Sequence, residues 1–144
     1  LNNAPGFDLA IIDTPPSLGL LAVNSLAAAQ GVIIPAQPQA ADLRSVQLFL
    51  QTLADIRAEL NPGLELLGVL LTFYNPRLNL HTEALETIKA SGLPLFDCQL
   101  GRSVRIAEAA GAGMPLMQYD HQNPQNEKFN LVADKVQKWL KNQR

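Results

Sequence analysis

The first residue able to take part in chemistry is Asp13, which ends the apolar run FDLAIID at residues 7–13. A continuous apolar run fits a strand that is buried on both faces, and an acid at its carboxyl end lies where open α/β sheets bind their ligands. A carboxylate in that position can hold Mg²⁺ through water. An apolar run that ends in an acid is common, however, and an acid that caps a turn explains Asp13 equally well. The next segment includes Thr14, Pro15, Pro16 and Gly19. Its prolines restrict the backbone, and its glycine allows more backbone conformations.

Charge is unevenly distributed along the chain. The formal net charge is −2, yet residues 1–100 carry nine acidic and four basic side chains, whereas residues 101–144 carry four acidic and seven basic ones. A basic carboxyl-terminal part is typical of a surface that binds a polyanion. A solvated helix face would have the same composition, so both interpretations stay open.

The composition excludes several kinds of site. The lone Cys98 excludes a disulfide framework and a cysteine-rich zinc site, and we expect it to be a buried structural thiol. His81 and His121 are too far apart for a metal-ligand motif. The longest apolar stretch, residues 18–29, is too short to cross a bilayer, and no signal peptide is recognisable. We therefore expect a cytoplasmic protein without a membrane anchor.

Four apolar runs predict the strands of a parallel sheet, at residues 7–13, 31–35, 64–73 and 93–98. Longer segments with helical periodicity lie between them, and this alternation is typical of an α/β fold. With 47% apolar and 17% charged residues among 144, the chain is large enough for one core. We expect a single domain over residues 1–144.

Apolar spacings of three and four predict the helices. Residues 43–60 form an amphipathic helix that ends at Asn61-Pro62-Gly63, and residues 18–29 are apolar nearly all round, which predicts a buried helix. Shorter helices are expected at residues 79–90 and 104–110. The last helix starts at Asn123-Pro124. Its lysines are expected to be solvated, and its predicted buried stripe consists of Phe129, Val132, Val136, Trp139 and Leu140.

Four segments, taken in order, resemble the ParA/Soj partition ATPases, which form the deviant-Walker group together with MinD. They are FDLAIIDTPPSLGLLAVN at 7–24, VIIPAQ at 32–37, GVLLTFYNPRLNL at 68–80 and RSVRIAEAAGAGMP at 102–115. The resemblance extends over nearly the whole chain. It implies a P-loop NTPase-like fold of the ParA type, with a partial parallel sheet flanked by helices.

The phosphate loop of that family does not occur in these residues. The sequence contains no GxxxxGK[ST] motif or deviant form of it, and no lysine precedes Lys89. The resemblance therefore implies the carboxyl-terminal part of a ParA-type protein, without the first βα unit. In the complete protein Asp13 would hold the Mg²⁺ of bound ATP, and Thr14, Pro15, Pro16 and Gly19 would belong to the switch that senses the nucleotide. Because phosphate binding depends on the loop, we expect this polypeptide alone not to hydrolyse ATP.

The same resemblance places other residues in functional roles. Arg77 and Arg105 match positions at which ParA proteins bind DNA without sequence preference, although a local ion pair, such as Arg105 with Glu108, is the alternative. The predicted contacts to the nucleotide base are Asn75, Gly101 and Arg102. Gly101 replaces a proline that is usual in the family, and we expect it to loosen its loop.

The resemblance implies that the complete protein is a DNA-partitioning ATPase. It would form an ATP-dependent homodimer, bind nucleoid DNA and be stimulated by a ParB-type partner. A different possibility is a non-enzymatic DNA- or partner-binding module that has lost its phosphate loop. A MinD-like membrane-positioning protein is disfavoured, because the apolar residues of the last helix are needed for the core.

Overall fold

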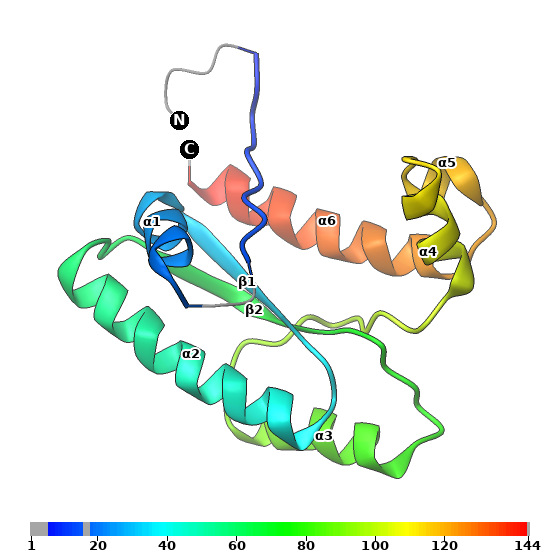
Figure 1. Cartoon of the computed structure of the whole chain (residues 1–144), viewed down its shortest axis with the longest axis horizontal. Helices are drawn as coiled ribbons and strands as arrows, with labels where there is room; N and C mark the ends of the chain where they lie inside the picture. The colour runs from blue at the N-terminus through cyan, green and yellow to red at the C-terminus, as the bar shows by residue number, and fades with distance from the viewer. Residues whose placement is uncertain (1–5, 16–17, 144) are drawn as a thin grey trace.

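The computed structural model describes residues 6–15 and 18–143. Strands β1 (Gly31–Ala36) and β2 (Glu65–Leu71) pair in parallel within the sheet. The helices are α1 (Leu20–Ala28), α2 (Ala40–Glu59), α3 (Asn79–Ala90), α4 (Val104–Gly111), α5 (Leu116–Tyr119) and α6 (Gln125–Asn142). In Figure 1, α2 and α3 lie on one side of the strands and α6 on the other. This α/β arrangement, a parallel sheet flanked by helices, confirms the predicted fold class.

The side chains of the sheet explain why helices cover both faces. Val69 and Leu71 are fully buried and pack with residues of α2 and α3, such as Val46 and Leu85. Leu70 points to the opposite face, where a second cluster contains the predicted stripe of α6. Burial on both faces is what continuous apolar strands require. Four of the five predicted stripe residues, Phe129, Val132, Val136 and Trp139, are partly buried and pack against that second cluster, whereas Leu140 is half-buried outside it.

The predicted strand at residues 93–98 is present only as one isolated parallel bridge to β2, between Leu95 and Val69. Val69 N donates to Pro94 O at 2.8 Å, and Phe96 N donates to Val69 O at 3.0 Å. Farther along, Leu100 N donates to Leu71 O at 2.8 Å. Pro94 has no N–H and interrupts the ladder. Residues 94–101 nevertheless follow the edge of β2 and carry the chain to α4.

The predicted strand at residues 7–13 does not form. In Figure 1 this segment runs across the strands instead of along them, and Phe7 and Ile11 are 80% and 86% exposed. A strand needs a neighbour for its backbone groups and a cover for both faces. No other segment within residues 6–15 and 18–143 pairs with it.

The helix predicted at residues 18–29 forms, but the prediction that it is buried is wrong for much of its surface. The helix forms as α1, but Leu20 is 75% and Leu21 66% exposed, and its buried residues are Ala22 and Leu26. Leu26 packs with residues of α2 and the start of β2. Asn61, just after α2, donates from Nδ2 to Leu26 O at 2.9 Å and to Ala29 O at 2.7 Å. The end of α1 is therefore anchored to the end of α2, while its opposite side is bare.

Candidate functional site

Asp13 lies in the extended segment before α1 and is exposed to solvent. With Thr14 and Pro15 it lines an open cavity of about 1340 Å³ between this segment and β1, α1, α2 and the end of α6. The charged residues that line the cavity, Asp8, Asp13 and Asp42, are all acidic. Among the predicted switch residues, Pro16 lies outside the described residues. Gly19 precedes α1, and its carbonyl accepts hydrogen bonds from Ala22 N and Val23 N at 3.0 and 3.2 Å.

Asp13 is the one predicted magnesium ligand, and its surroundings can be compared with what a magnesium–nucleotide site needs. Mg²⁺ in such sites is held by one or two carboxylates together with phosphate oxygens and water, and Asp13 fits the carboxylate role. No group of three or more His, Cys, Asp or Glu able to hold a metal occurs in the described part of the chain. The phosphates would need a cradle of backbone N–H groups and a lysine, and the sequence has no such motif. Asp13 can therefore serve as a magnesium ligand only together with a phosphate-binding loop.

The loop after β2 is tightly organised. Asn75 N donates to His81 Nδ1 at 3.0 Å, and the His81 ring lies 6.0 Å from the Tyr74 ring. Asn75 Oδ1 accepts a hydrogen bond from Arg77 N at 3.0 Å. Asn75 therefore uses its side-chain oxygen to form a turn that carries the exposed Arg77.

The second predicted base-contact loop lies beside the first. Tyr74 and Gly101 form a parallel bridge, and the guanidinium carbon of Arg102 lies 5.5 Å from the centre of the Phe73 ring. The structure thus brings the loop of Asn75 together with Gly101 and Arg102. Phe73 has a φ of +52°, which is an unusual backbone conformation for a bulky residue. The chain turns sharply at this position, shortly after the end of β2.

Gly101 is tied down and not loosened. Its N–H donates to Gln125 Oε1 at 2.9 Å, at the first residue of α6. A Cβ at this position would lie 3.0 Å from Gln125 Nε2, so a larger residue would require the Gln125 side chain to shift by a few tenths of an ångström. A proline would have no N–H to donate. The sequence-based expectation missed Gln125 because it lies 24 residues farther along the chain.

The two predicted DNA-binding arginines differ in their surroundings. Arg77 is exposed, and within residues 6–15 and 18–143 its guanidinium has no hydrogen bond or ion pair. Arg105 Nη1 lies 2.8 Å from Glu108 Oε2, and its Nε lies 3.8 Å from Asp120 Oδ2. The hydrogen bond that Arg105 donates to the Glu108 carboxylate, together with the negative charge of that carboxylate, raises the pKa of Arg105. The local ion pair considered as the alternative is therefore present at Arg105.

Lys135 on α6 is not a solvated lysine. Its Nζ donates to Leu95 O at 3.0 Å and lies 4.3 Å from the centre of the Phe96 ring. This contact holds α6 against the edge segment that leads to Gly101. Lys138 and Lys141 are exposed, as expected of a solvated face.

A second contact fixes the far end of α6. The Glu65 carboxylate accepts hydrogen bonds from Trp139 Nε1 and Gln143 Nε2, each at 2.8 Å. The Trp139 bond is the main cause that lowers the pKa of Glu65, followed by the Gln143 bond.

Cys98 is buried as expected, and desolvation raises the pKa of its thiol.

Comparison with known proteins identifies the class. A family model described as AAA domain matches residues 2–66. The chain is 38% identical to the crystal structure of cobyrinic acid a,c-diamide synthase from Mycobacterium smegmatis with bound ATP analogue and magnesium, with a TM-score of 0.64 over 72% of this chain and 41% of that one. Apo McdA from Cyanthece has the same fold, with a TM-score of 0.74 at 20% identity over 86% and 51% of the two chains. The fold is therefore that of the P-loop ATPases.

Relatives in sequence give the particular family. The chromosome-partitioning ATPase Soj of Thermus thermophilus is 39% identical over 132 residues, 91% of this chain and 53% of the relative. The chromosome partitioning protein ParA of Caulobacter vibrioides is 36% identical over 135 residues, 93% of this chain and 50% of the relative. The chain is thus of the ParA/Soj type, and it spans about half the length of the curated relatives it matches. No described helix is long and apolar enough to cross a membrane.

Proposed function

We propose that the complete protein is a ParA-type DNA-partitioning ATPase, which dimerises with ATP and binds DNA without sequence preference. The similarity to Soj and ParA over more than nine-tenths of the chain is the observation that carries this proposal. A ParB-type partner would stimulate hydrolysis, and the protein would act in the cytoplasm on the nucleoid. Asp13 would hold Mg²⁺ through water, and the segment from Thr14 to Gly19 would respond to the nucleotide.

The nucleotide part of the proposal depends on residues outside the described site. Asn75, Gly101 and Arg102 would contact the base, which is supported by the contact between their two loops. The 144-residue polypeptide alone is expected to release no phosphate from ATP above background. Mg²⁺-dependent turnover by this polypeptide would contradict that expectation.

DNA binding would involve Arg77 and Arg105. An arginine that contacts a phosphate releases counterions, so its contribution falls as salt rises. For an exposed, charge-assisted contact we expect about 1 kcal/mol, or roughly five-fold in Kd, for each arginine. Arg77 is the better exposed of the two, because Arg105 is already paired.

The test measures the fluorescence anisotropy of a labelled random-sequence duplex with the protein expressed from its complete gene, with and without ATP. Arg77→Ala, Arg105→Ala and the double variant are compared with Arg44→Ala, which removes the same charge from an exposed position on α2. We expect weaker binding for the first three and little change for the control. Equal affinity of the double variant and the wild type would remove the DNA claim.

Two other outcomes would point to the other functions. DNA binding that is indifferent to ATP would favour a non-enzymatic binding module. Sedimentation with liposomes would favour a MinD-like membrane protein. The second is disfavoured because the apolar stripe of α6 packs against the sheet and is not free for a membrane.

A further inference from the structure

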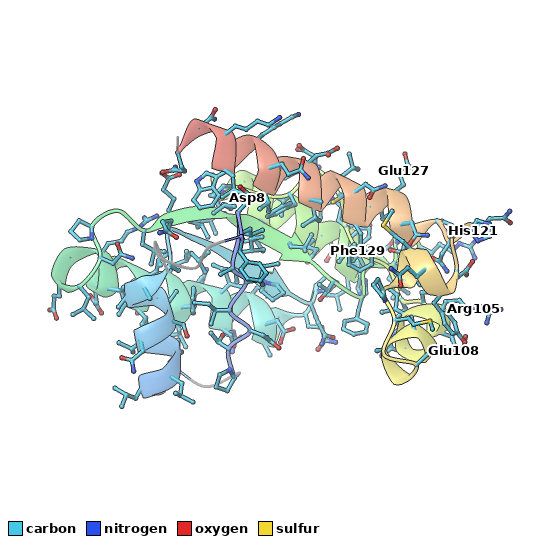
Figure 2. The ribbon with its side chains drawn as sticks, turned by 90° about the horizontal axis from the view of Figure 1, so that it is seen from above. Asp8, Arg105, Glu108, His121, Glu127 and Phe129 are labelled. Carbon is cyan, nitrogen blue, oxygen red and sulfur yellow. The ribbon has the colours of Figure 1, made fainter. Side chains whose placement is uncertain are left out.

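Arg105 is held by two carboxylates from different elements. Glu108 lies one turn later on α4, and its Oε2 is 2.8 Å from Arg105 Nη1. Asp120 directly follows α5, and its Oδ2 is 3.8 Å from Arg105 Nε. Figure 2 shows Arg105 and Glu108 together at the end of the molecule where α4 and α5 lie. Glu108 and Asp120 are named here the Arg105 clamp.

Both carboxylates of the clamp are themselves held in place. Tyr119 Oη lies 3.4 Å from Glu108 Oε2, to which it donates. Asn123 Nδ2 donates to Asp120 Oδ2 at 3.0 Å, and the buried Asn126 donates from Nδ2 to Asp120 O at 2.8 Å. The two acids therefore meet Arg105 as positioned partners and not as freely moving side chains.

We propose that the Arg105 clamp is an autoinhibitory contact, in which Glu108 and Asp120 compete with DNA phosphates for the guanidinium of Arg105. This inference rests on the proposed DNA binding. A guanidinium has five N–H donors and binds a phosphate through two of them. In this structure Glu108 occupies Nη1 and Asp120 faces Nε. A phosphate must displace a carboxylate or accept its repulsion.

The competition is expected to reduce DNA affinity and not to abolish it. All three side chains are partly exposed, at 57% for Arg105, 40% for Glu108 and 30% for Asp120. Exposed ion pairs are weak and are screened by salt. We therefore expect release of one carboxylate to strengthen DNA binding by about two-fold to five-fold at low salt.

The variant Glu108→Gln tests the clamp, and Glu127→Gln is its matched control. Glu127 is exposed in the first turn of α6, has no hydrogen bond or ion pair within the described residues, and points away from Arg105 in Figure 2. Both variants remove one negative charge, but of the two only Glu108→Gln removes a carboxylate that contacts Arg105. Circular dichroism confirms that each variant is folded, and Asp120→Asn serves as a second route to the same release.

The assay is the anisotropy titration of the random-sequence duplex, with the protein from its complete gene in the presence of ATP and Mg²⁺. We expect Glu108→Gln to bind DNA about two-fold to five-fold more tightly than Glu127→Gln does. In the Arg105→Ala background the same change is expected to give no more than the control. Equal effects of the two glutamate variants, or weaker binding by Glu108→Gln, would overturn the clamp.

The outcomes separate this inference from the proposed function. If Arg105→Ala weakens binding while Glu108→Gln behaves like Glu127→Gln, only the clamp is wrong. If neither Arg77→Ala nor Arg105→Ala changes DNA affinity, the proposed function loses its DNA contacts and the clamp is overturned with it.

Discussion

Gly68 combines a positive φ with close packing, so the fold is expected to be sensitive to a single added methyl group there. Its φ of +147° is strained for any residue with a Cβ, and an added Cβ would lie 3.0 Å from Pro94 O and 3.3 Å from Phe96 Cδ2. The conformational strain costs about 1–3 kcal/mol, and the crowding against the edge segment adds about 1–3 kcal/mol. Gly68→Ala is therefore expected to destabilise the protein by about 2–6 kcal/mol, which lowers Tm by roughly 5–20 °C.

Two other glycines separate strain from crowding. Gly92 has φ of +73° and nothing within 4 Å of its added Cβ, so Gly92→Ala should cost only about 1 kcal/mol, from strain. Gly63 has no positive φ and its nearest neighbour is 3.8 Å away, so Gly63→Ala should change stability little. Thermal unfolding followed by far-ultraviolet circular dichroism measures all three. If Gly68→Ala loses no more stability than Gly92→Ala does, the contacts of β2 with Pro94 and Phe96 do not add the expected cost of crowding.

Two further predictions concern the contacts that hold α6. The pKa of Glu65 is lowered in the folded protein, so the ionised carboxylate contributes stability at neutral pH that is lost as the pH falls below 4.5, the ordinary pKa of this group. Glu65→Gln should therefore unfold at a lower temperature than wild type at pH 7. A difference in Tm that does not shrink in acid would contradict the hydrogen bond between Glu65 and Trp139. Lys135→Met should cost about 1 kcal/mol, since it loses the bond to Leu95 O but keeps its packing. Urea unfolding compares it with Lys138→Met, and equal stability of the two variants would show that the bond contributes nothing.

Local signals predicted the elements that depend on local chemistry. The apolar spacing of residues 79–90, with Lys89 in the last turn and Gly92 beyond it, gives α3 with the predicted bounds. Gly92 adopts the positive φ of a helix end. The mainly apolar runs at residues 31–35 and 64–73 also form strands, as β1 over Gly31–Ala36 and β2 over Glu65–Leu71.

The sequence did not correctly predict which residues near the amino-terminal end are buried. Residues 7–13 and 18–29 have the composition of buried elements, yet Ile11 and Leu20 are mostly exposed. Composition reports what a segment can bury, whereas burial itself needs a neighbouring element to cover it. Within the described residues no element covers the outer sides of these two segments.

The candidate site shows the same limit of sequence reasoning. The pairing of Arg105 with Glu108 is visible as a spacing of three on a helix, but Asp120 reaches Arg105 through the turn after α5. Likewise, no residue near Gly101 in sequence indicates that the Gly101 N–H donates a hydrogen bond to the Gln125 side chain. Contacts between residues far apart in sequence depend on how α6 packs, and that follows from tertiary structure alone.

The salt dependence of DNA affinity shows whether Arg77 and Arg105 contact DNA phosphates. The measurement is the slope of log K against log salt for the protein from its complete gene with ATP, between about 50 and 200 mM salt. Each arginine that contacts a phosphate contributes about 0.9 to that slope. We expect the slope to be shallower by roughly 2 for the double variant Arg77→Ala/Arg105→Ala than for wild type. An unchanged slope would show that these two arginines do not bind the DNA backbone.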